Sequence, residues 1–517
     1  TGPLLSAFVL MPSFGLSVTN IVACSMNFGL AIIIFAARRS LLEGMWKPGE
    51  PLRFWPTREE PPPADPSPPE DTAGEAFDDA RPEDAQVIVI NTCGFIDAAK
   101  EESVNTILEM GALRESGACE KLVVAGCLSQ RYPEELAREM PEVDHFLGSS
   151  DMLKLADVLA EGAPRMLVGN PAEHTMRATD PRRLSQGAHS AYVKIAEGCN
   201  RSCAFCTIPS FRGKQRSRPI DDVVDEVKRL VDQGAVEINL ISQDTIAYGR
   251  DRADDADLTR LVERVAEVEG LRWLRLFYLY PETLKDGLLT LLAEHPRVLP
   301  YVDMPLQHAS DAMLRRMKRG HGGARLRRVV ERLRARVPEL VFRTAFIVGH
   351  PGETEADFEE LLDFVRWARF DRVGVFRYSV EEGTASGAMD GLVEPKVIAS
   401  RHRRLMAAQR PISRERMQAM LGASVEVLVE GVSEESELLL QGRWWGQAPE
   451  VDGHVLLANG AARPGELRRA YVTHAADYDL VADLYAPDGS LPEPPPGADD
   501  RPPPRRDQAP KMRLRVV

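Results

Sequence analysis

Short apolar runs alternate with amphipathic stretches between about residues 85 and 380. Apolar runs at 86–90 and 122–125, with a helical stretch at 98–110 between them, predict a small α/β unit with buried parallel strands. Six later runs predict strands at 192–196, 236–241, 274–279, 301–304, 342–348 and 373–378. Repeated strand–helix units predict a second, larger parallel sheet, so the expected fold class is α/β.

The predicted helix at 355–368 is an example of the amphipathic stretches that lie between these strands. Phe358, Leu361, Leu362 and Val365 recur at helical spacing, so they share one face of the helix. A similar pattern occurs at 220–233. We therefore expect such helices to pack their apolar faces against the larger sheet.

The two ends of the chain depart from this pattern. Residues 1–84 form an atypical extension, with an apolar stretch at 21–37 and then a Pro-rich acidic linker. The stretch is at the short end of the membrane-spanning range, so a membrane anchor is one interpretation. A misassigned upstream reading frame or a divergent extension is the interpretation that we favour. Alternating runs in 421–487 predict a small β-barrel, and the Pro-rich, then basic, residues 488–517 predict a disordered tail.

Composition narrows the class of protein. A chain of 517 residues, 44% of them hydrophobic, is long enough for about three domains with real cores. Seven cysteines are an odd number and are clustered, which favours metal binding over a disulfide framework. A net charge of −14 argues against a nucleic-acid backbone as the main partner. These numbers agree with a cytoplasmic enzyme whose main partner is neither a nucleic acid nor a membrane.

Three cysteines on one short stretch carry most of the chemical information. Cys199, Cys203 and Cys206 have the spacing C-x3-C-x2-C, with no further cysteine or histidine close behind. A structural zinc site closes with four ligands, whereas three thiolates suit a [4Fe–4S] cluster that keeps one iron open. The stretch, with Phe205 inside it, resembles the signature of radical S-adenosylmethionine (SAM) enzymes, in which the open iron binds SAM. A zinc knuckle or reduced core thiols are the alternatives.

Two more cysteines directly follow the predicted strands of the small unit. Cys93 lies in Asn-Thr-Cys-Gly-Phe and Cys127 in Gly-Cys-Leu-Ser-Gln, 34 positions apart. Sites in parallel α/β sheets gather at the carboxyl ends of strands. We therefore expect both thiols to face one ligand.

These motifs together resemble the radical SAM methylthiotransferase family, in the branch that modifies a ribosomal protein and not the branch that modifies adenosine in tRNA. The resemblance rests on NTCGFIDAAKEES (91–103), GCNRSCAFCTIPSFRGKQRSRP (198–219), PLQHASDAML (305–314), FIVGHPGET (346–354) and VEGVSEESELLLQGRWWGQAPEVDG (429–453). It implies an N-terminal methylthiotransferase domain at 85–165, a radical SAM (β/α)6 partial barrel at 185–420 and a small C-terminal β-barrel of the TRAM type at 421–487.

The same resemblance implies cofactors, substrate and partners. One [4Fe–4S] cluster would be held by the three-cysteine loop, and a second by Cys93, Cys127 and one more cysteine. SAM would serve both as methyl donor and as the source of the radical. The target would be the β-carbon of an aspartate in the twelfth small-subunit ribosomal protein, with an electron donor such as flavodoxin.

One departure from the family concerns the second cluster. The family's third N-terminal cysteine motif is missing, and Cys24 shares only a C-x-x-N skeleton with it. Cys24 is therefore a candidate ligand whose alternative is a small apolar residue in an apolar stretch. Cys119 has no motif and is interpreted as a plain thiol.

The resemblance also suggests cofactor contacts, each with a plainer alternative. Phe205 would shield the cluster or the adenine, or simply pack. Polar groups for the SAM amino group would follow the second of the six strands of the larger sheet: Ser242, Gln243 and Asp244. The alternative is that they form a plain helix N-cap. Gln307 and Ser310, after the fourth strand of the larger sheet, would face the nucleoside. Gly349 and Glu353, after its fifth strand, would lie near the adenine. We interpret His350 as loop surface, and Lys194 as either an active-centre contact or an ion-pair partner.

Charge offers an independent argument about the substrate. Residues 421–485 hold eleven acidic and four basic side chains, a net charge of −7, which would repel RNA and attract a basic ribosomal protein. Trp444 and Trp445 add either an apolar anchor or barrel core. The competing functions are a tRNA adenosine methylthiotransferase and, in another class, a non-catalytic membrane-tethered Fe–S protein.

Overall fold

A computed structural model describes residues 82–116, 119–160, 162–182, 184, 187–281, 284–433, 436–486 and 488–491. The predictions for the apolar stretch, the Pro-rich linker, Cys24 and the basic tail lie outside the described residues. Among the helices in the described ranges, none combines the length and the apolar character needed to cross a lipid bilayer.

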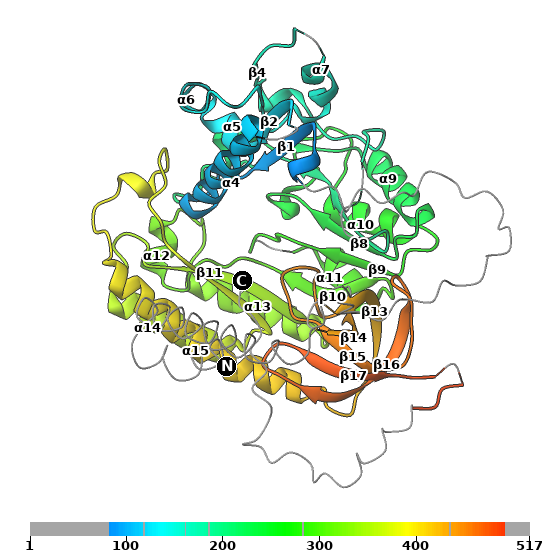
Figure 1. Ribbon diagram of the computed structural model, residues 1–517. Helices are drawn as coiled ribbons and strands as arrows, with labels where there is room; N and C mark the ends of the chain where they lie inside the picture. The colour runs from blue at the N-terminus through cyan, green and yellow to red at the C-terminus, as the bar shows by residue number, and fades with distance from the viewer. Residues whose placement is uncertain are drawn as a thin grey trace, which may run out of the picture. The chain divides into compact units, whose positions relative to one another are not determined.

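The first sheet has four parallel strands in the order of the chain (Figure 1). They are β1 (Val87–Thr92), β2 (Lys121–Gly126), β3 (His145–Leu147) and β4 (Met166–Leu167). Its helices are α4 (Asp97–Ser116), α5 (Cys127–Arg131), α6 (Pro133–Glu139) and α7 (Leu155–Leu159), with short 3-10 turns η2 (Pro82–Asp84), η3 (Met152–Lys154) and η4 (Pro171–Glu173). The predicted α/β unit is confirmed, and its helix is longer than the predicted 98–110 stretch.

The second sheet has six strands, and all its neighbouring pairs are parallel. In order across the sheet they are β12 (Arg372–Arg377), β11 (Val341–Val348), β10 (Val298–Asp303), β9 (Trp273–Leu276), β8 (Glu237–Ile241) and β5 (Ser190–Lys194). The sheet does not close, because β12 and β5 are its two edges. The predicted six strands and the open partial barrel are confirmed.

Helices between and after these strands surround the sheet, and most of them bury an apolar face in its core. They are α8 (Ile208–Arg212), α9 (Ile220–Asp232), α10 (Leu258–Ala266), α11 (Asp286–Glu294), α12 (Asp311–Arg316), α13 (Gly323–Arg336), α14 (Glu355–Ala368) and α15 (Pro395–Gln418), with the 3-10 turns η5 (Thr245–Ala247) and η6 (Ser386–Ala388). α14 begins with a capping box between Thr354 and Asp357, which fixes its first turn. Its predicted apolar face is buried, and a fully buried Phe358 contributes about 1.5–3 kcal/mol.

The C-terminal strands form a closed five-stranded barrel. Around the barrel they are β13 (Ser424–Ser433), β14 (Ser436–Trp444), β15 (Val455–Asn459), β17 (Leu480–Leu484) and β16 (Leu467–Ala475). Trp273 and Tyr301 of the six-stranded sheet share a buried cluster with Val427 and Leu480 of the barrel. Trp444 is buried in the same cluster, so its core interpretation is the correct one.

A buried ion-pair network also joins this barrel to the six-stranded sheet. Glu237, at the start of β8, is fully buried and accepts hydrogen bonds from Arg443 at 2.6 Å and from Arg275 at 3.0 Å. Arg443 also donates to Glu430 at 2.6 Å. Burial alone would raise the pKa of Glu237, but the two arginines outweigh it and lower the pKa to about 2. The carboxylate therefore stays charged inside the interface.

Candidate metal and cofactor site

The three-cysteine loop leaves the end of the edge strand β5 and is closed at its base by two short strands. β6 (Ala196–Glu197) pairs with β7 (Arg216–Ser217), and the Cys199 amide donates to the Gly213 carbonyl at 3.1 Å. Gly198 has φ +80°, and a Cβ there would lie 2.3 Å from the Lys214 carbonyl oxygen. Only glycine fits this close approach, which fixes where the loop begins.

The three thiols of this loop lie close enough to influence one another. Cys199 is buried, whereas Cys203 and Cys206 are half-buried. Burial is the main cause that raises the pKa of Cys206 to about 12, and the nearby sulfurs of Cys203 and Cys199 act in the same direction. Burial therefore favours the neutral thiol of Cys206, and this loop would hold thiolates only around a positively charged metal centre.

The donor set fits a cluster better than a single ion. Among the described residues, no three cysteine, histidine or acidic side chains are placed to share one metal ion. A structural zinc site closes with four ligands, whereas this loop offers three thiols. In a [4Fe–4S] cube each thiolate binds its own iron, so three separated thiols and an open fourth iron remain compatible with this loop.

Polar atoms without partners lie next to the loop, at the end of β8. Within the described residues, Gln243 Oε1 and Asp244 Oδ1 are buried and accept no hydrogen bond. The other Asp244 oxygen accepts from Arg201 Nε at 2.5 Å. Asp244 stands at the N-cap of η5, yet its side chain makes no capping bond, so the N-cap alternative is wrong for it. Each such buried acceptor costs about 1–3 kcal/mol, which a ligand's donor would recover.

The contacts of Ser242, Phe205 and Lys194 say less about their roles at the site. Ser242 is buried, and its hydroxyl is 3.1 Å from that of Thr245. Phe205, which lies between Cys203 and Cys206 in the sequence, is half-buried. Lys194 forms an ion pair with Glu197 at 2.6 Å, as its plainer interpretation expected.

Gln307 and Ser310 follow β10 but play different parts. Gln307 is half-buried and has φ +70°, a left-handed conformation that non-glycine residues adopt at a cost of about 1–3 kcal/mol. Ser310 is buried, caps α12 by accepting from the Met313 amide, and donates to Asp357. The Ser310 hydroxyl is thus already hydrogen-bonded within the protein. The costly backbone conformation of Gln307, by contrast, is typical of functional residues.

The loop after β11 is held by its own buried network. Glu353 accepts from the Gly349 amide at 2.6 Å and from Arg401 at 2.7 Å, and its other oxygen is 3.0 Å from His308 Nε2. Gly349 has φ +82°, and the space beside it is filled by Ile398, because a Cβ would lie 2.4 Å from Ile398 Cγ1. This glycine therefore allows a close contact with Ile398 of α15, and its expected approach to adenine stays a prediction.

His350, next in that loop, is fully buried, so its interpretation as loop surface is wrong. Its Nε2 is 2.7 Å from the Ser386 hydroxyl. Burial lowers the pKa of His350 to about 4, which keeps the ring neutral near neutral pH.

The second cysteine pair lies at the ends of two adjacent strands. Thr92 of β1 pairs with Gly126 of β2, and Cys93 and Cys127 directly follow them. A Cβ on Gly94 would be 2.8 Å from the Cys127 carbonyl oxygen, so the two chain segments touch. The two cysteine segments are thus adjacent, whereas a ligand shared by both thiols stays a prediction, and Cys127 begins a short helix instead of lying in a turn. Cys93 is exposed and Cys127 is buried.

Arginines that the sequence did not single out contact the sulfurs. Arg212 of α8 donates to Cys127 Sγ at 2.9 Å and to Glu197 at 3.0 Å. Arg319 donates to Cys203 Sγ at 3.2 Å and lies over the ring of Tyr280. Arg212 lies within the 198–219 motif and could have been noticed there, whereas nothing in the sequence marks Arg319.

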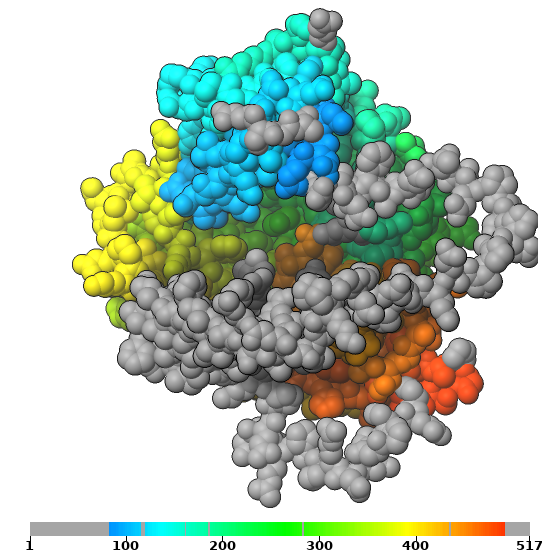
Figure 2. Space-filling view, viewed as in Figure 1, coloured from blue at the N-terminus to red at the C-terminus, as the bar shows by residue number. Residues whose placement is uncertain are grey.

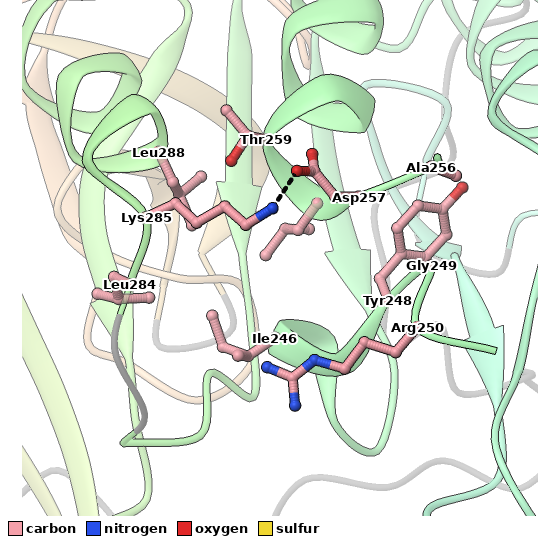
Figure 3. A pocket seen from close by; sticks show the side chains of 11 residues that line it. Ile246, Tyr248, Gly249, Arg250, Ala256, Asp257, Thr259, Leu284, Lys285 and Leu288 are labelled. Carbon is pink, nitrogen blue, oxygen red and sulfur yellow. Dashed lines mark hydrogen bonds and ion pairs between the residues drawn. The ribbon is translucent and has the colours of Figure 1, made fainter. Parts of the chain in front are cut away.

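A pocket elsewhere on the large domain does not take part. It lies between η5, α10 and α11, where Lys285 and Asp257 form a 2.5 Å ion pair at its wall (Figure 3). None of the predicted metal or cofactor residues lines it. The carboxyl ends of the strands, not this pocket, therefore remain the candidate site.

Comparisons with known proteins match this arrangement along the chain. The model of the Radical SAM superfamily matches residues 193–365, that of Uncharacterized protein family UPF0004 matches 73–148, and that of the TRAM domain matches 421–484. The Ribosomal protein uS12 methylthiotransferase RimO of Sorangium cellulosum (strain So ce56) is 66% identical over 78% of this chain and 83% of its own length. The protein of the same name from Myxococcus xanthus (strain DK1622) is 52% identical over 77% of this chain and 84% of its own length.

Among solved structures, the radical S-adenosylmethionine methyltransferase TsrM from Kitasatospora setae is similar at a TM-score of 0.47 and 14% identity. The match covers 58% of this chain and 64% of that one.

Proposed function

The chain belongs to the ribosomal protein uS12 methylthiotransferase family of radical SAM enzymes, and we propose that it adds a methylthio group to the β-carbon of an aspartate in uS12. One observation carries the proposal. The three thiols of a single loop lie beside the buried, unpartnered acceptors of Gln243 and Asp244, at the carboxyl ends of a parallel sheet. Three thiolates would bind three irons of a [4Fe–4S] cluster and leave the fourth iron open. The two acceptor oxygens would receive hydrogen bonds from the amino group of SAM.

We assign the cluster and cofactor roles as follows. Cys199, Cys203 and Cys206 hold the reductive [4Fe–4S] cluster, and Cys93, Cys127 and, as the candidate third ligand, Cys24 hold the auxiliary one. Bound SAM supplies the radical chemistry that breaks an unactivated C–H bond, which acid–base groups cannot break. Gln243 and Asp244 orient its amino group, and Gln307 faces its nucleoside. We assign Phe205 to the space over the cluster, while Ser242, Ser310, Gly349 and Glu353 hold the surrounding loops.

The substrate proposal follows from charge as well as from family membership. The C-terminal barrel region carries a net charge of −7, which favours a basic ribosomal protein over tRNA. We propose a cytoplasmic enzyme that takes electrons from a flavodoxin-type donor.

The test is anaerobic reconstitution of the full chain with iron and sulfide, followed by incubation with SAM, a reductant and either uS12 or tRNA. Mass spectrometry should find methylthiolated aspartate in uS12 and no methylthio-adenosine in tRNA. Cys203→Ala should abolish 5′-deoxyadenosine formation, because three thiolates leave no spare ligand. Cys119→Ser is the matched control, since this thiol has no ligand role in the proposal, lies in the core of the first α/β unit and donates to the Lys121 carbonyl at 3.4 Å. Modified tRNA with unmodified uS12 would contradict the proposal.

A further inference from the structure

One loop of the large domain touches both cysteine sites. Residues 379–388, which we call the bridge loop, follow β12 and end in η6. In Figures 1 and 2 they belong to the yellow part of the chain, which borders on the blue helix α4. The bridge loop therefore connects elements that are nearly 300 residues apart in sequence.

On one side the bridge loop holds the segments that carry Cys93 and Cys127. Glu381, only 4% exposed, accepts from the Asp97 amide at 2.8 Å and from Lys100 Nζ at 3.1 Å. Arg131, the last residue of α5, lies 3.8 Å from Glu381 and donates to the Glu382 carbonyl at 2.6 Å. Arg131 also donates to the Gly94 carbonyl at 2.7 Å. The residue after Cys93 and the helix that begins with Cys127 are thus tied to this loop.

On the other side the bridge loop holds the three-cysteine loop. The Ser386 amide donates to the carbonyl of Ala204, which lies between Cys203 and Cys206, at 2.8 Å. The Ser386 hydroxyl contacts buried His350, which fixes this end of the loop to the segment after β11.

Internal contacts make the bridge loop a stiff spacer. The Thr384 hydroxyl donates to the Glu381 carbonyl at 2.7 Å and accepts from the Gly387 amide at 2.9 Å. A Cβ at position 387 would lie 2.5 Å from the Glu381 carbonyl oxygen, so glycine lets the loop close on itself. Ser379 donates to the Glu381 carboxylate at 3.0 Å. These contacts link Glu381 to the turn that carries Ser386.

We propose that the bridge loop sets the distance between the auxiliary cysteine site and the radical SAM cysteine loop, with Glu381 as the positioning residue. This inference rests on the proposed function, in which sulfur from one site must reach a carbon radical generated beside the other. A misplacement of about 1 Å can cost about a hundredfold in rate. Variants that loosen the bridge loop should therefore still form 5′-deoxyadenosyl radicals, but fewer of these radicals should lead to methylthiolated product.

The test compares Glu381→Gln with Glu382→Gln in the reconstituted full chain. Glu381→Gln removes the charge that pairs with Lys100 and Arg131 while keeping the side chain's shape. The Glu382 side chain is exposed and makes only a 3.3 Å contact with the Tyr132 hydroxyl, and the Arg131 bond uses its main chain. We expect Glu381→Gln to raise the ratio of 5′-deoxyadenosine to methylthiolated uS12 about tenfold or more, with 5′-deoxyadenosine formation itself within about twofold of wild type. The control should keep the wild-type ratio.

A second readout needs no cluster. In the metal-free protein, amide hydrogen exchange at 97–103 should accelerate in Glu381→Gln and stay unchanged in the control, since Glu381 accepts the Asp97 amide. Glu381→Asp should restore part of the coupling, because it returns the charge. If Glu381→Gln does not fold, Lys100→Met tests the same contact from the other side and should shift the ratio in the same direction.

An unchanged ratio, or equal losses of 5′-deoxyadenosine and product, would overturn the inference while leaving the proposed function intact. Failure of the wild-type enzyme to modify uS12 would overturn the proposed function instead, and it would be seen before any variant is made.

Discussion

Replacing Glu237 by Gln should strongly destabilise the attachment of the C-terminal barrel to the six-stranded sheet. Glu237, Arg275 and Arg443 are all fully buried, and the carboxylate is the group that both arginines contact. Removing one partner from a buried pair leaves uncompensated charge and costs about 3–5 kcal/mol. The pKa offers a second route to the magnitude. A shift from 4.5 to about 2 corresponds to about 3 kcal/mol, so the two estimates agree.

The pH dependence has a definite sign. Since folding lowers this pKa, the stabilisation is present above the unfolded value of 4.5 and is lost as the pH falls towards 2. The difference in unfolding free energy between wild type and Glu237→Gln should therefore be full at pH 7 and shrink progressively below about pH 4.5. Trp444 and Trp273 are buried in the shared cluster, so tryptophan fluorescence during urea unfolding reports on this interface.

The chain offers a matched control between the same two domains. Arg272 and Glu426 also pair across them at 3.0 Å, but both side chains are largely exposed, at 54% and 40%. Glu426→Gln should cost less than about 1 kcal/mol, because water screens an exposed pair. If Glu237→Gln costs no more than Glu426→Gln, or if its cost is the same at pH 3 and pH 7, the reasoning about the buried network is wrong.

Three further outcomes follow from the site and the core. Changing both Cys93 and Cys127 to Ala should leave about four irons per chain, preserve 5′-deoxyadenosine formation and abolish methylthio transfer, as iron analysis and product assays would show. His350→Gln should flatten the fall in stability between pH 6.5 and about 4 that calorimetry should find in wild type, because burial depresses this pKa and the neutral ring is the stable form. Phe358→Ala should lower the unfolding free energy by about 3–5 kcal/mol in urea titrations, since the ring is fully buried; a loss below 1 kcal/mol would mean that the core closes over the gap.

Local sequence was sufficient for elements whose signals are carried by neighbouring residues. The spacing of Phe358, Leu361, Leu362 and Val365 predicted the buried face of α14. The apolar runs predicted the six strands of the larger sheet and β1 and β2 of the smaller one, but not the short strands β3 and β4. The spacing of Cys199, Cys203 and Cys206 predicted a metal-binding loop for the same reason. Gly198 is needed there because only glycine tolerates the close approach of the Lys214 carbonyl.

Residue roles at the strand ends were less predictable, because they depend on which partners the fold delivers. Ser310 and Glu353 were expected near the cofactor, which stays a prediction, and the sequence did not show that Asp357 and Arg401 hold their side chains. Asp244 was equally compatible with a helix cap, and only its contact with Arg201 and its unpartnered second oxygen separate the two interpretations. His350 looked like loop surface because burial of a polar residue leaves no mark in a Gly-Pro-rich segment.

The sequence by itself determined the fold class, the six strands of the larger sheet, the three-cysteine loop and the acidic character of the C-terminal barrel, since each depends on short-range spacing or on composition. Only the tertiary structure decided which charges meet. Glu237 and Arg443 lie 206 positions apart, and Glu381 and Lys100 lie 281 apart. A sequence records no distance between such residues. Their pairing arises where separate layers of the fold pack together, because a buried charge needs an opposite charge in the layer that covers it.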